Sequence, residues 1–385
     1  SEVRVNNLSN ENNTGGPTIS GITTYSGRHF FVPPQGDTAS RPSDCEPGSL
    51  RFNTDTAHLE YFRGNTIGWV EIEAELTLPL GGGGSTSQFE SNRSSLGHRA
   101  IFAAGSDASS NALNPIDFIT IPSLGNATDF GDMGNATNRP GGLANNIRGL
   151  ISGGQISPSY TDNIEFITVS SQGDNTGFGN LTQSRWYPAC LSSQTRGIMG
   201  GGYGPANFNI IDFVTIASTG DAVDFGDLTA TKREVSAVCS TTRGIFCGGQ
   251  PVPATNVIEF ITISTTGDAA DFGDLTGNRL TAGAGTSATR GVLFGGGSPG
   301  AVNIIDFITM ASTGNAIDFG DTLEAKSLRS NGITSDCVRA LTAGYSGGNV
   351  IEFVQIATTG NSKDFGDLTV ARFVPAAMST GHGGL

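Results

Sequence analysis

A tripeptide of the form Ile-acid-Phe recurs six times along this chain, and its even spacing restricts the fold more than any other feature. Successive acidic residues stand 46 to 48 residues apart, and a Phe-Gly pair begins twelve residues after each tripeptide phenylalanine. A repeat of this length is typical of chains built from similar supersecondary units that pack on their neighbours. The acidic residues are Asp117, Glu165, Asp212, Glu259, Asp306 and Glu352.

Two arginines recur with the same period. One precedes an apolar run that ends in small residues, and its series is Arg99, Arg148, Arg196, Arg243, Arg290 and Arg339. The other follows Phe-Gly by 7 to 10 residues, and its series is Arg139, Arg185, Arg233, Arg279, Arg329 and Arg372. We assign a structural role to the acids and to the first arginine series. We predict a pair of acid and arginine between adjacent strands or repeats, which fixes register more than it adds stability.

Each repeat is expected to form four short strands. In one repeat they are residues 234–239, the run 243–247, the β-branched and aromatic stretch 258–263, and about 270–275. A Thr-Gly-Asp or Thr-Gly-Asn turn separates the last two strands in most repeats. Four strands and their connections account for a period of about 47 residues. No long amphipathic helix is visible.

The repeats predict an all-β fold, a six-bladed β-propeller whose four-stranded blades cover one another on both faces. The segment 372–378 matches the first strand of the other repeats, so we expect the C-terminal strand to complete the first blade and close the ring. An elongated β-solenoid and an intertwined fibre are the rival architectures. The apolar run that ends in Gly-Gly resembles the kelch repeat over residues 89–385, although the tyrosine and tryptophan of that repeat are missing. The expected domain is therefore kelch-like.

The first 80 residues have a different composition and are expected to form a separate segment. Residues 48–56, 58–62 and 68–72 predict three short strands, a small β-meander, after a stretch rich in Asn, Thr, Gly and Ser. Three strands alone are marginally stable in water, so we expect this segment to contact a partner. Residues 81–88 contain four consecutive glycines and are expected to be a flexible linker to the propeller at 89–385.

Several short motifs are similar to modules in structural proteins of tailed bacteriophages, especially marine cyanophages. The similarity covers the run 48–56, Leu-Glu-Tyr-Phe at 59–62, Gly-Trp at 68–69, and the earlier runs 31–34 and 38–42. The repeat text 216–229, Ile-Ala-Ser-Thr-Gly-Asp-Ala-Val-Asp-Phe-Gly-Asp-Leu-Thr, resembles the same group. The resemblance implies a virion structural protein of the tail, baseplate or fibre apparatus.

Composition and motifs argue against several classes of function. The 21 basic and 35 acidic residues give a net charge of −14, which is unfavourable for general nucleic-acid binding and for docking on an anionic membrane. No apolar run is long enough to predict a membrane span. Five cysteines without CxxC spacing, and four histidines in unlike contexts, predict neither a zinc site nor a nucleophile. We therefore predict a protein without catalytic residues.

One metal hypothesis competes with a simpler interpretation. Asp221, Asp224 and Asp227 are spaced three apart around a turn and a Phe-Gly pair, and oxygen-rich loops suit Ca²⁺. Aspartate and asparagine also cap turns without any metal. Other repeats break the pattern, as with Gly177, so we favour turn capping and assign no metal and no cofactor.

The loops between the second and third strands differ from repeat to repeat, and variable loops on a rigid frame are where recognition tends to occur. They carry Tyr160, Tyr203, Phe208 and Tyr345. Such side chains stack on sugar rings or anchor protein interfaces, and they also simply fill loop surface.

The resulting hypothesis is a virion protein, assembled in the host cytoplasm and present as a homo-oligomer or in many copies per particle. Residues 1–80 would attach it to other virion proteins, and the propeller would bind a host-surface glycan or a protein, with affinity raised by multivalency. The alternatives are a capsid or baseplate decoration protein without a receptor role, and a propeller-type carbohydrate-active enzyme. The enzyme would need a pair of carboxylates that stands apart from the repeat background.

Overall fold

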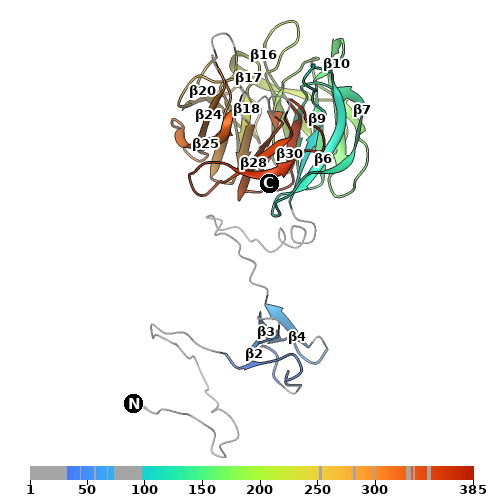
Figure 1. Ribbon diagram of the computed structural model, residues 1–385, viewed down its shortest axis with the longest axis vertical. Coiled ribbons are helices and arrows are strands. Elements are labelled where there is room, and N and C mark those ends of the chain that lie inside the picture. Colours follow the sequence, from blue (N-terminus) through green and yellow to red (C-terminus); the bar gives the residue numbers. More distant parts are fainter. Residues whose placement is uncertain are drawn as a thin grey trace, which may run out of the picture. The chain divides into compact units, whose positions relative to one another are not determined.

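The chain forms two compact units, Ser1–Gly82 and Gly83–Leu385 (Figure 1). The computed structural model describes residues 33–43, 45–55, 58–66, 68–72, 98–250, 254–280, 283–297, 300–326, 331–332, 334–344 and 348–385. Within these ranges the fold is all-β and contains no helix, and therefore no helix that could span a membrane. The predicted linker at 81–88 lies outside the described residues.

The N-terminal unit is a four-stranded sheet. Its strands are β1 (Gln35–Gly36), β2 (Leu50–Asn53), β3 (His58–Phe62) and β4 (Trp69–Ile72). Strands β2, β3 and β4 are the three expected from the sequence and pair antiparallel in chain order, whereas β1 adds a parallel edge that no pattern predicted.

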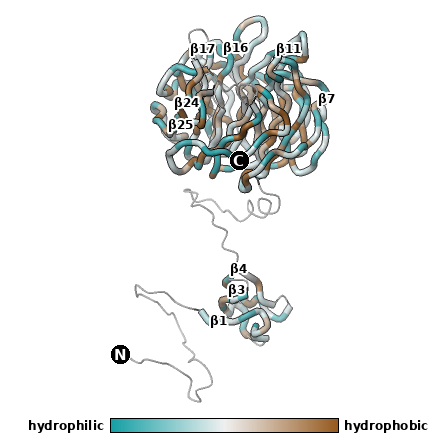
Figure 2. Tube along the Cα trace, viewed as in Figure 1, coloured by the Kyte–Doolittle hydropathy of each residue, from teal (hydrophilic) through white to brown (hydrophobic). Residues whose placement is uncertain are grey.

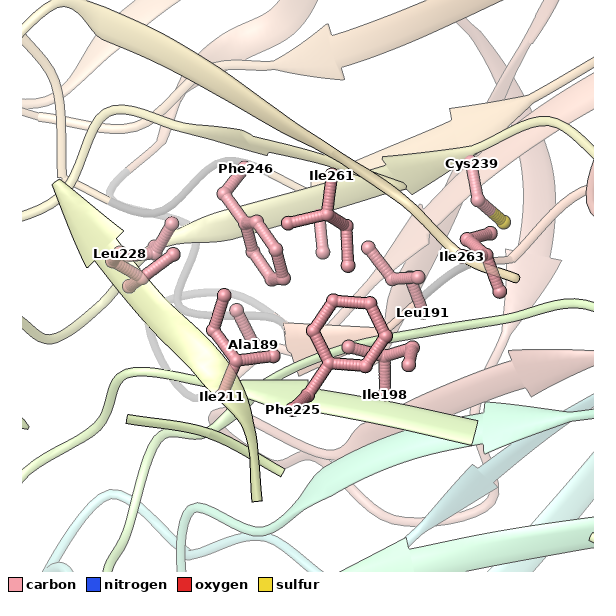
Figure 3. Packing of buried hydrophobic residues seen from close by; sticks show 12 residues of the cluster. Ala189, Leu191, Ile198, Ile211, Phe225, Leu228, Cys239, Phe246, Ile261 and Ile263 are labelled. Carbon is pink, nitrogen blue, oxygen red and sulfur yellow. The ribbon is translucent and has the colours of Figure 1, made fainter. Parts of the chain in front are cut away.

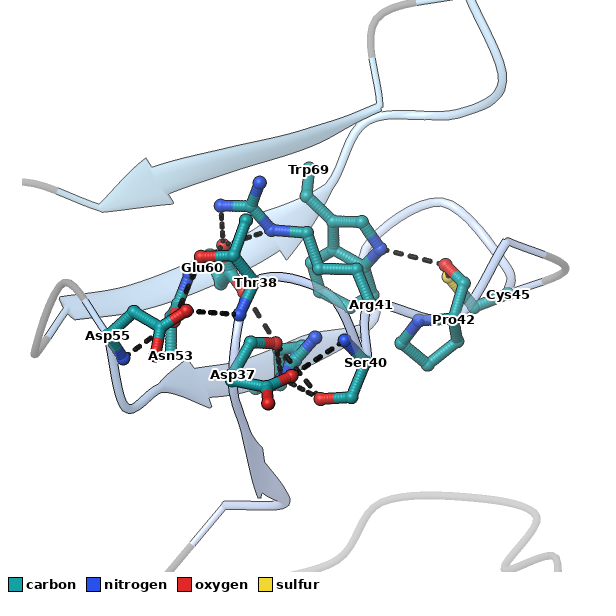
Figure 4. A network of polar contacts seen from close by, with 11 residues as sticks. Asp37, Thr38, Ser40, Arg41, Pro42, Cys45, Asn53, Asp55, Glu60 and Trp69 are labelled. Carbon is teal, nitrogen blue, oxygen red and sulfur yellow. Dashed lines mark hydrogen bonds and ion pairs between the residues drawn. The ribbon is translucent and has the colours of Figure 1, made fainter.

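A buried carboxylate holds this small unit together. Glu60 is fully buried on β3 and accepts two hydrogen bonds from Arg41, while Arg51 lies 3.5 Å from its other oxygen (Figure 4). The Arg51 guanidinium also lies over the ring of Trp69, whose indole N–H donates to the carbonyl of Pro42. With so few apolar side chains available, this network ties the loop around Arg41 to the sheet.

Each repeat of the C-terminal unit contributes a second, a third and a fourth strand that pair antiparallel in chain order. The second strands are β5 (Arg99–Ala103), β9 (Arg148–Ser152), β15 (Arg196–Gly200), β19 (Arg243–Cys247), β23 (Arg290–Phe294) and β27 (Arg339–Ala343). The third strands are β6 (Leu113–Thr120), β12 (Asn163–Thr168), β16 (Phe208–Thr215), β20 (Val257–Thr262), β24 (Val302–Thr309) and β28 (Val350–Gln355). The fourth strands are β7 (Thr128–Thr137), β13 (Thr176–Asn180), β17 (Val223–Lys232), β21 (Ala270–Asp274), β25 (Ile317–Lys326) and β29 (Lys363–Asp367).

The first strands are short, fully buried and rich in small residues. They are β30 (Ala376–Ser379), β8 (Gly141–Ala144), β14 (Ala189–Ser192), β18 (Ser236–Cys239) and β22 (Gly283–Thr286). Each packs against the next in that order, and β22 packs against β27 of the sixth repeat. Small residues are required here, because a Cβ on Gly142 would lie 2.9 Å from the carbonyl oxygen of Ala377. The short strand β26 (Asn331–Gly332) pairs in parallel with both β30 and β8.

The C-terminal segment completes the first repeat, as its sequence predicts. Strand β30 pairs antiparallel with β5, 273 positions upstream at the pair Ala376 and Ala103, and Figure 1 shows the red strand beside the cyan strands. The residues after β30 fold inward and are buried. His382 lies within hydrogen-bonding distance of the carbonyl of Ala144 and of Ser192, and Gly383 donates to Thr286, so this tail touches the second, third and fifth repeats.

Apolar side chains fill the spaces between neighbouring sheets. In one cluster Leu191, Ile198 and Phe225 of the third repeat pack with Phe246 and Ile261 of the fourth (Figure 3). Hydrophobic stretches accordingly run along the strands of this unit, and hydrophilic residues concentrate in the connections (Figure 2). Burial of each such side chain contributes about 1.5–3 kcal/mol. Because the sheets are covered on both faces, the third strands are apolar on both sides.

Two kinds of repeat alternate along the chain. In the first, third and fifth repeats the third strand has 8 residues and the fourth has 10, whereas in the even repeats they have 6 and 5. The odd repeats carry a second irregularity in this pairing, for example between Phe208 and Ile210. The tripeptide acid follows the same alternation, aspartate in odd repeats and glutamate in even ones.

The chain connections define two ends of these sheets. The turn end carries the connections from first to second strand and from third to fourth strand. The loop end carries the connections from second to third strand and from one repeat to the next. Strand β10 (Gln155–Ile156) and its partner β11 (Ser159–Tyr160) form a small hairpin at the loop end, which β10 marks in Figure 1.

The first arginine series corrects the predicted pairing with the acids. Arg196 lies over the ring of Phe213 in its own repeat, 4.9 Å from the centroid, and donates to the carbonyl of Ile263 in the next repeat. The same two contacts recur in all six repeats, and Arg339 of the sixth donates to Ile121 of the first. These arginines satisfy backbone carbonyls at the turn end, so the carboxylates need another cation.

That cation stands seven residues after the Phe of Phe-Gly in the preceding repeat. Arg185 pairs with Asp212 at 2.9 Å, and the corresponding pairs are Lys232 with Glu259, Arg279 with Asp306, and Arg372 with Asp117. All of these side chains are almost completely buried. A threonine three residues before the cation donates both its N–H and its hydroxyl to the same carboxylate, as Thr182 does to Asp212. The pairs therefore link consecutive repeats.

The junction between the first and second repeats is different. Thr137 occupies the position of the cation, and Glu165 is only partly buried, whereas the other five acids are buried. Burial raises the pKa of Glu165, and a hydrogen bond from Asn175 opposes that rise. Arg139, from the second predicted series, is directed elsewhere, and Arg329 lies outside the described residues.

Candidate functional site

The most variable described surface lies at the loop end, eight residues after the Phe of each Phe-Gly pair. Each residue there forms a backbone bridge to a residue of the loop between the second and third strands. Such bridges need only backbone atoms, so the side chains are free to differ. The described residues at this position are Asn138, Trp186, Arg233, Leu280 and Phe373. Equivalent places on one frame thus present amide, indole, guanidinium and apolar groups.

Trp186 is the centre of an aromatic cluster. Its ring centroid lies 5.4 Å from that of Tyr160, 5.6 Å from that of Tyr187 and 5.8 Å from that of Tyr203. Tyr160 meets Tyr203 edge-on at 6.0 Å. The rings come from three separate segments, namely the loop of the second repeat, the connection to the third repeat, and the loop of the third repeat. Tyr160, Trp186 and Tyr203 are partly exposed, and Tyr187 is buried beneath them.

Two guanidinium groups flank these rings. The Arg139 guanidinium lies over the ring of Trp186, 4.2 Å from its centroid, and that of Arg233 lies over Tyr203 at 4.6 Å. Stacking on a ring face leaves the N–H groups at the edge of a guanidinium available to other partners. Arg233 uses Nε to donate to Gln250. Neither arginine forms an ion pair with any residue that the structure describes.

The structure unites only some of the predicted binding residues. Tyr160 and Tyr203 meet in the cluster, and Tyr345 lies outside the described residues. Phe208 begins β16 and pairs with Lys232, and its ring is close to Gly204 instead of the cluster. Trp186, Arg139 and Arg233 were not predicted. Comparing the repeats eight and nine residues after each Phe-Gly phenylalanine would have found them, because the chemistry changes there while the backbone does not.

The candidate calcium aspartates join repeats. Asp221 accepts the backbone N–H of Asn180 in the preceding repeat at 2.9 Å. An aspartate or asparagine at this turn position makes the equivalent bond in every repeat, and Asn126 of the first accepts from Asp367 of the sixth. These side chains bridge to the neighbouring repeat, which corrects the expectation that they cap their own turn. Among the described ranges, no three His, Cys, Asp or Glu side chains are grouped to hold a metal ion.

The cysteines are packing residues. All five are free thiols, and Cys190, Cys239 and Cys247 are buried. Burial raises the pKa of Cys190 and of Cys239 to about 12, so both thiols stay protonated at neutral pH. A protonated thiol is a poor nucleophile, and these side chains contribute to the core instead.

The geometry of the loop end suits binding rather than bond breaking. Partly exposed aromatic rings offer apolar faces, and two stacked arginines offer donors and positive charge, while no carboxylate joins the cluster as an acid or base. Compared with known proteins, the chain matches no protein-family model, and no curated protein matches it.

Proposed function

We propose that the C-terminal unit is a six-bladed, kelch-like β-propeller that serves as a recognition domain. Closure of a ring is supported by contacts that pass from each repeat to the next and from the sixth back to the first. Arg339 bonds to Ile121, Gly125 to Phe365, and the buried pair of Arg372 and Asp117 joins the last connection to the first repeat. A closed ring removes the sheet edges along which such chains would otherwise associate.

The proposed biological setting is a bacteriophage virion, in the tail, fibre or baseplate apparatus. The short motifs at 48–69 and 216–229 support this setting through their resemblance to phage structural proteins. Residues 1–80 would anchor the chain to other virion proteins, and the propeller would bind a host-surface molecule. The single observation that carries the recognition role is the cluster around Trp186, which occupies one sector of an otherwise regular frame.

Immunogold electron microscopy tests this proposal. Antibodies raised against residues 89–385 would be applied to intact phage particles that carry the chain, and gold would be counted on tail and head. Label at the tail tip or fibres, together with blocked adsorption to host cells, is the expected result. Label spread over the capsid would make the chain a decoration protein and overturn the receptor role. Absence of label on particles would overturn the virion setting.

A further inference from the structure

We propose that the row Arg139, Trp186, Tyr203 and Arg233 binds an acidic oligosaccharide, in which sugar rings lie on the aromatic groups and carboxylates meet the two arginines. Consecutive members of the row are 4.2, 5.8 and 4.6 Å apart, measured between guanidinium carbons and ring centroids. The inference rests on the proposed recognition function and specifies the class of ligand.

The charge of the two arginines is the first step of the argument. The cations at Arg185, Lys232, Arg279 and Arg372 each have a carboxylate partner, and the chain carries 14 more acidic than basic residues. Arg139 and Arg233 nevertheless have no carboxylate partner among the described residues. Arginine recognises carboxylates through parallel N–H donors, and a guanidinium already fixed over a ring loses little freedom on binding. An acidic ligand would supply the missing partners.

The rings between these arginines select the rest of the ligand. Sugar rings have faces of C–H groups and rims of hydroxyls, so they combine apolar contact with hydrogen bonding at the edge. Tyr160 stands edge-on to Tyr203, and the tyrosine hydroxyls and the free guanidinium edges surround the ring faces. The indole N–H of Trp186 is buried and has no hydrogen-bond partner in the described structure. Aromatic faces that alternate with polar edges fit a chain of sugar rings.

Nucleic acid is the less suitable polyanion. Its affinity comes from many phosphate contacts, each of which releases counterions, and two arginines on a chain of net charge −14 supply few. An acidic peptide would meet the arginines equally well, but it has no ring to lie on Trp186 and Tyr203. This difference can be measured directly.

The experiment titrates the full-length chain with tetragalacturonate and follows both heat and fluorescence. The chain has only two tryptophans, so Trp69→Phe leaves Trp186 as the sole indole reporter. A neutral galactose tetrasaccharide and a short polyglutamate are the comparison ligands. The variants are Arg139→Gln and Arg233→Gln, and Lys363→Gln on the exposed part of β29 is the matched control, because it removes the same charge from a different repeat.

Tetragalacturonate is expected to bind and to change Trp186 fluorescence, with an affinity that falls as salt is added. Arg139→Gln and Arg233→Gln should each weaken binding about tenfold or more, and Lys363→Gln should leave it unchanged. Equal binding of the neutral sugar, equal binding of polyglutamate, an equal loss in Lys363→Gln, or no binding of tetragalacturonate would each overturn the acidic-sugar inference. None of these outcomes changes the immunogold result, so the proposed function stands or fails separately.

Discussion

The turn end and the loop end of the repeats have the same backbone but opposite variability. At the turn end, the same arginine, the same Phe-Gly pair and the same Thr-Gly-Asp or Thr-Gly-Asn turn make the same contacts in repeat after repeat. At the loop end, equivalent positions carry Asn138, Trp186, Arg233, Leu280 and Phe373. The comparison teaches where to look for function in a repeat protein.

The difference has a physical origin. Turn-end side chains satisfy N–H and C=O groups of the neighbouring repeat, so any replacement leaves a buried polar group without a partner. Loop-end positions bond through their own backbone, which places no demand on the side chain. Selection for binding can therefore act on the loop end alone, and the cluster around Trp186 is the largest departure from the repeat there.

The comparison breaks most severely if the buried layer beneath the loop end is damaged. Asp212→Ala removes the partner of Arg185 and the acceptor of Thr182, both from the preceding repeat. An uncompensated buried charge costs about 3–5 kcal/mol, so the free energy of unfolding should fall by about that amount. Chemical denaturation measures the loss. The matched control is Glu165→Ala, where no cation is paired, and an equal loss in both variants would contradict the assigned role of the pair.

A turn-end glycine should show the next largest effect. Gly226 has φ of +147°, and a Cβ there would lie 2.5 Å from the carbonyl group of Gly267 in the next repeat. Gly226→Ala is therefore expected to lower the free energy of unfolding by about 2 kcal/mol or more, through backbone strain and displacement of the neighbouring turn. Gly220, in an open turn position with no atom within 4 Å of a Cβ, is the control. A similar cost for Gly220→Ala would show that the close approach between repeats is unimportant.

The sequence predicted more of the frame than of the candidate site, because the frame repeats. Six copies of Ile-acid-Phe and Phe-Gly were enough to predict four strands per repeat and the pairing of the C-terminal strand with the first repeat. The partner of the acid was predicted wrongly, since two arginine series were equally regular in spacing. Only the fold shows that the residue seven positions after Phe-Gly reaches the next carboxylate, and that in one repeat this residue is Lys232 instead of an arginine.

The candidate site was harder to predict, because it is assembled from unlike segments. Tyr160 and Tyr203 could be chosen as aromatic residues in variable loops. Trp186 stands in a connection between repeats, and Arg139 and Arg233 were hidden within a series that was read as structural. Their proximity depends on how consecutive sheets are placed side by side, which no local pattern encodes.

A smaller effect is expected from the first arginine series. Arg196→Ala removes one hydrogen bond to Ile263 and the stacking on Phe213, both partly exposed to solvent at the turn end. The expected cost is about 1–2 kcal/mol in the free energy of unfolding. Arg196→Lys should recover only part of it, because an ammonium does not stack on the ring as a planar group does. Full recovery by lysine would mean that charge alone matters.

The smallest effect tests the one junction that lacks a cation. Burial raises the pKa of Glu165 above its ordinary value of 4.5, so the folded state binds its proton more tightly than the unfolded state does. Above the raised pKa the ionised side chain carries a desolvation cost, and stability increases as the pH falls through that pKa. Glu165→Gln should therefore be slightly more stable than the native chain at pH 7, by less than about 1 kcal/mol because solvent screens the partly exposed group.

The advantage of Glu165→Gln should disappear as the pH approaches 4.5, which thermal melting at several pH values measures. Glu259→Gln is the matched control, since the same substitution there breaks a buried pair with Lys232 and must destabilise the chain at pH 7. If both variants lose stability at pH 7, an unrecognised cation stabilises Glu165. In that case the first junction would follow the same rule as the others, and the cluster around Trp186 would be the only described sector of the loop end that departs from the repeat.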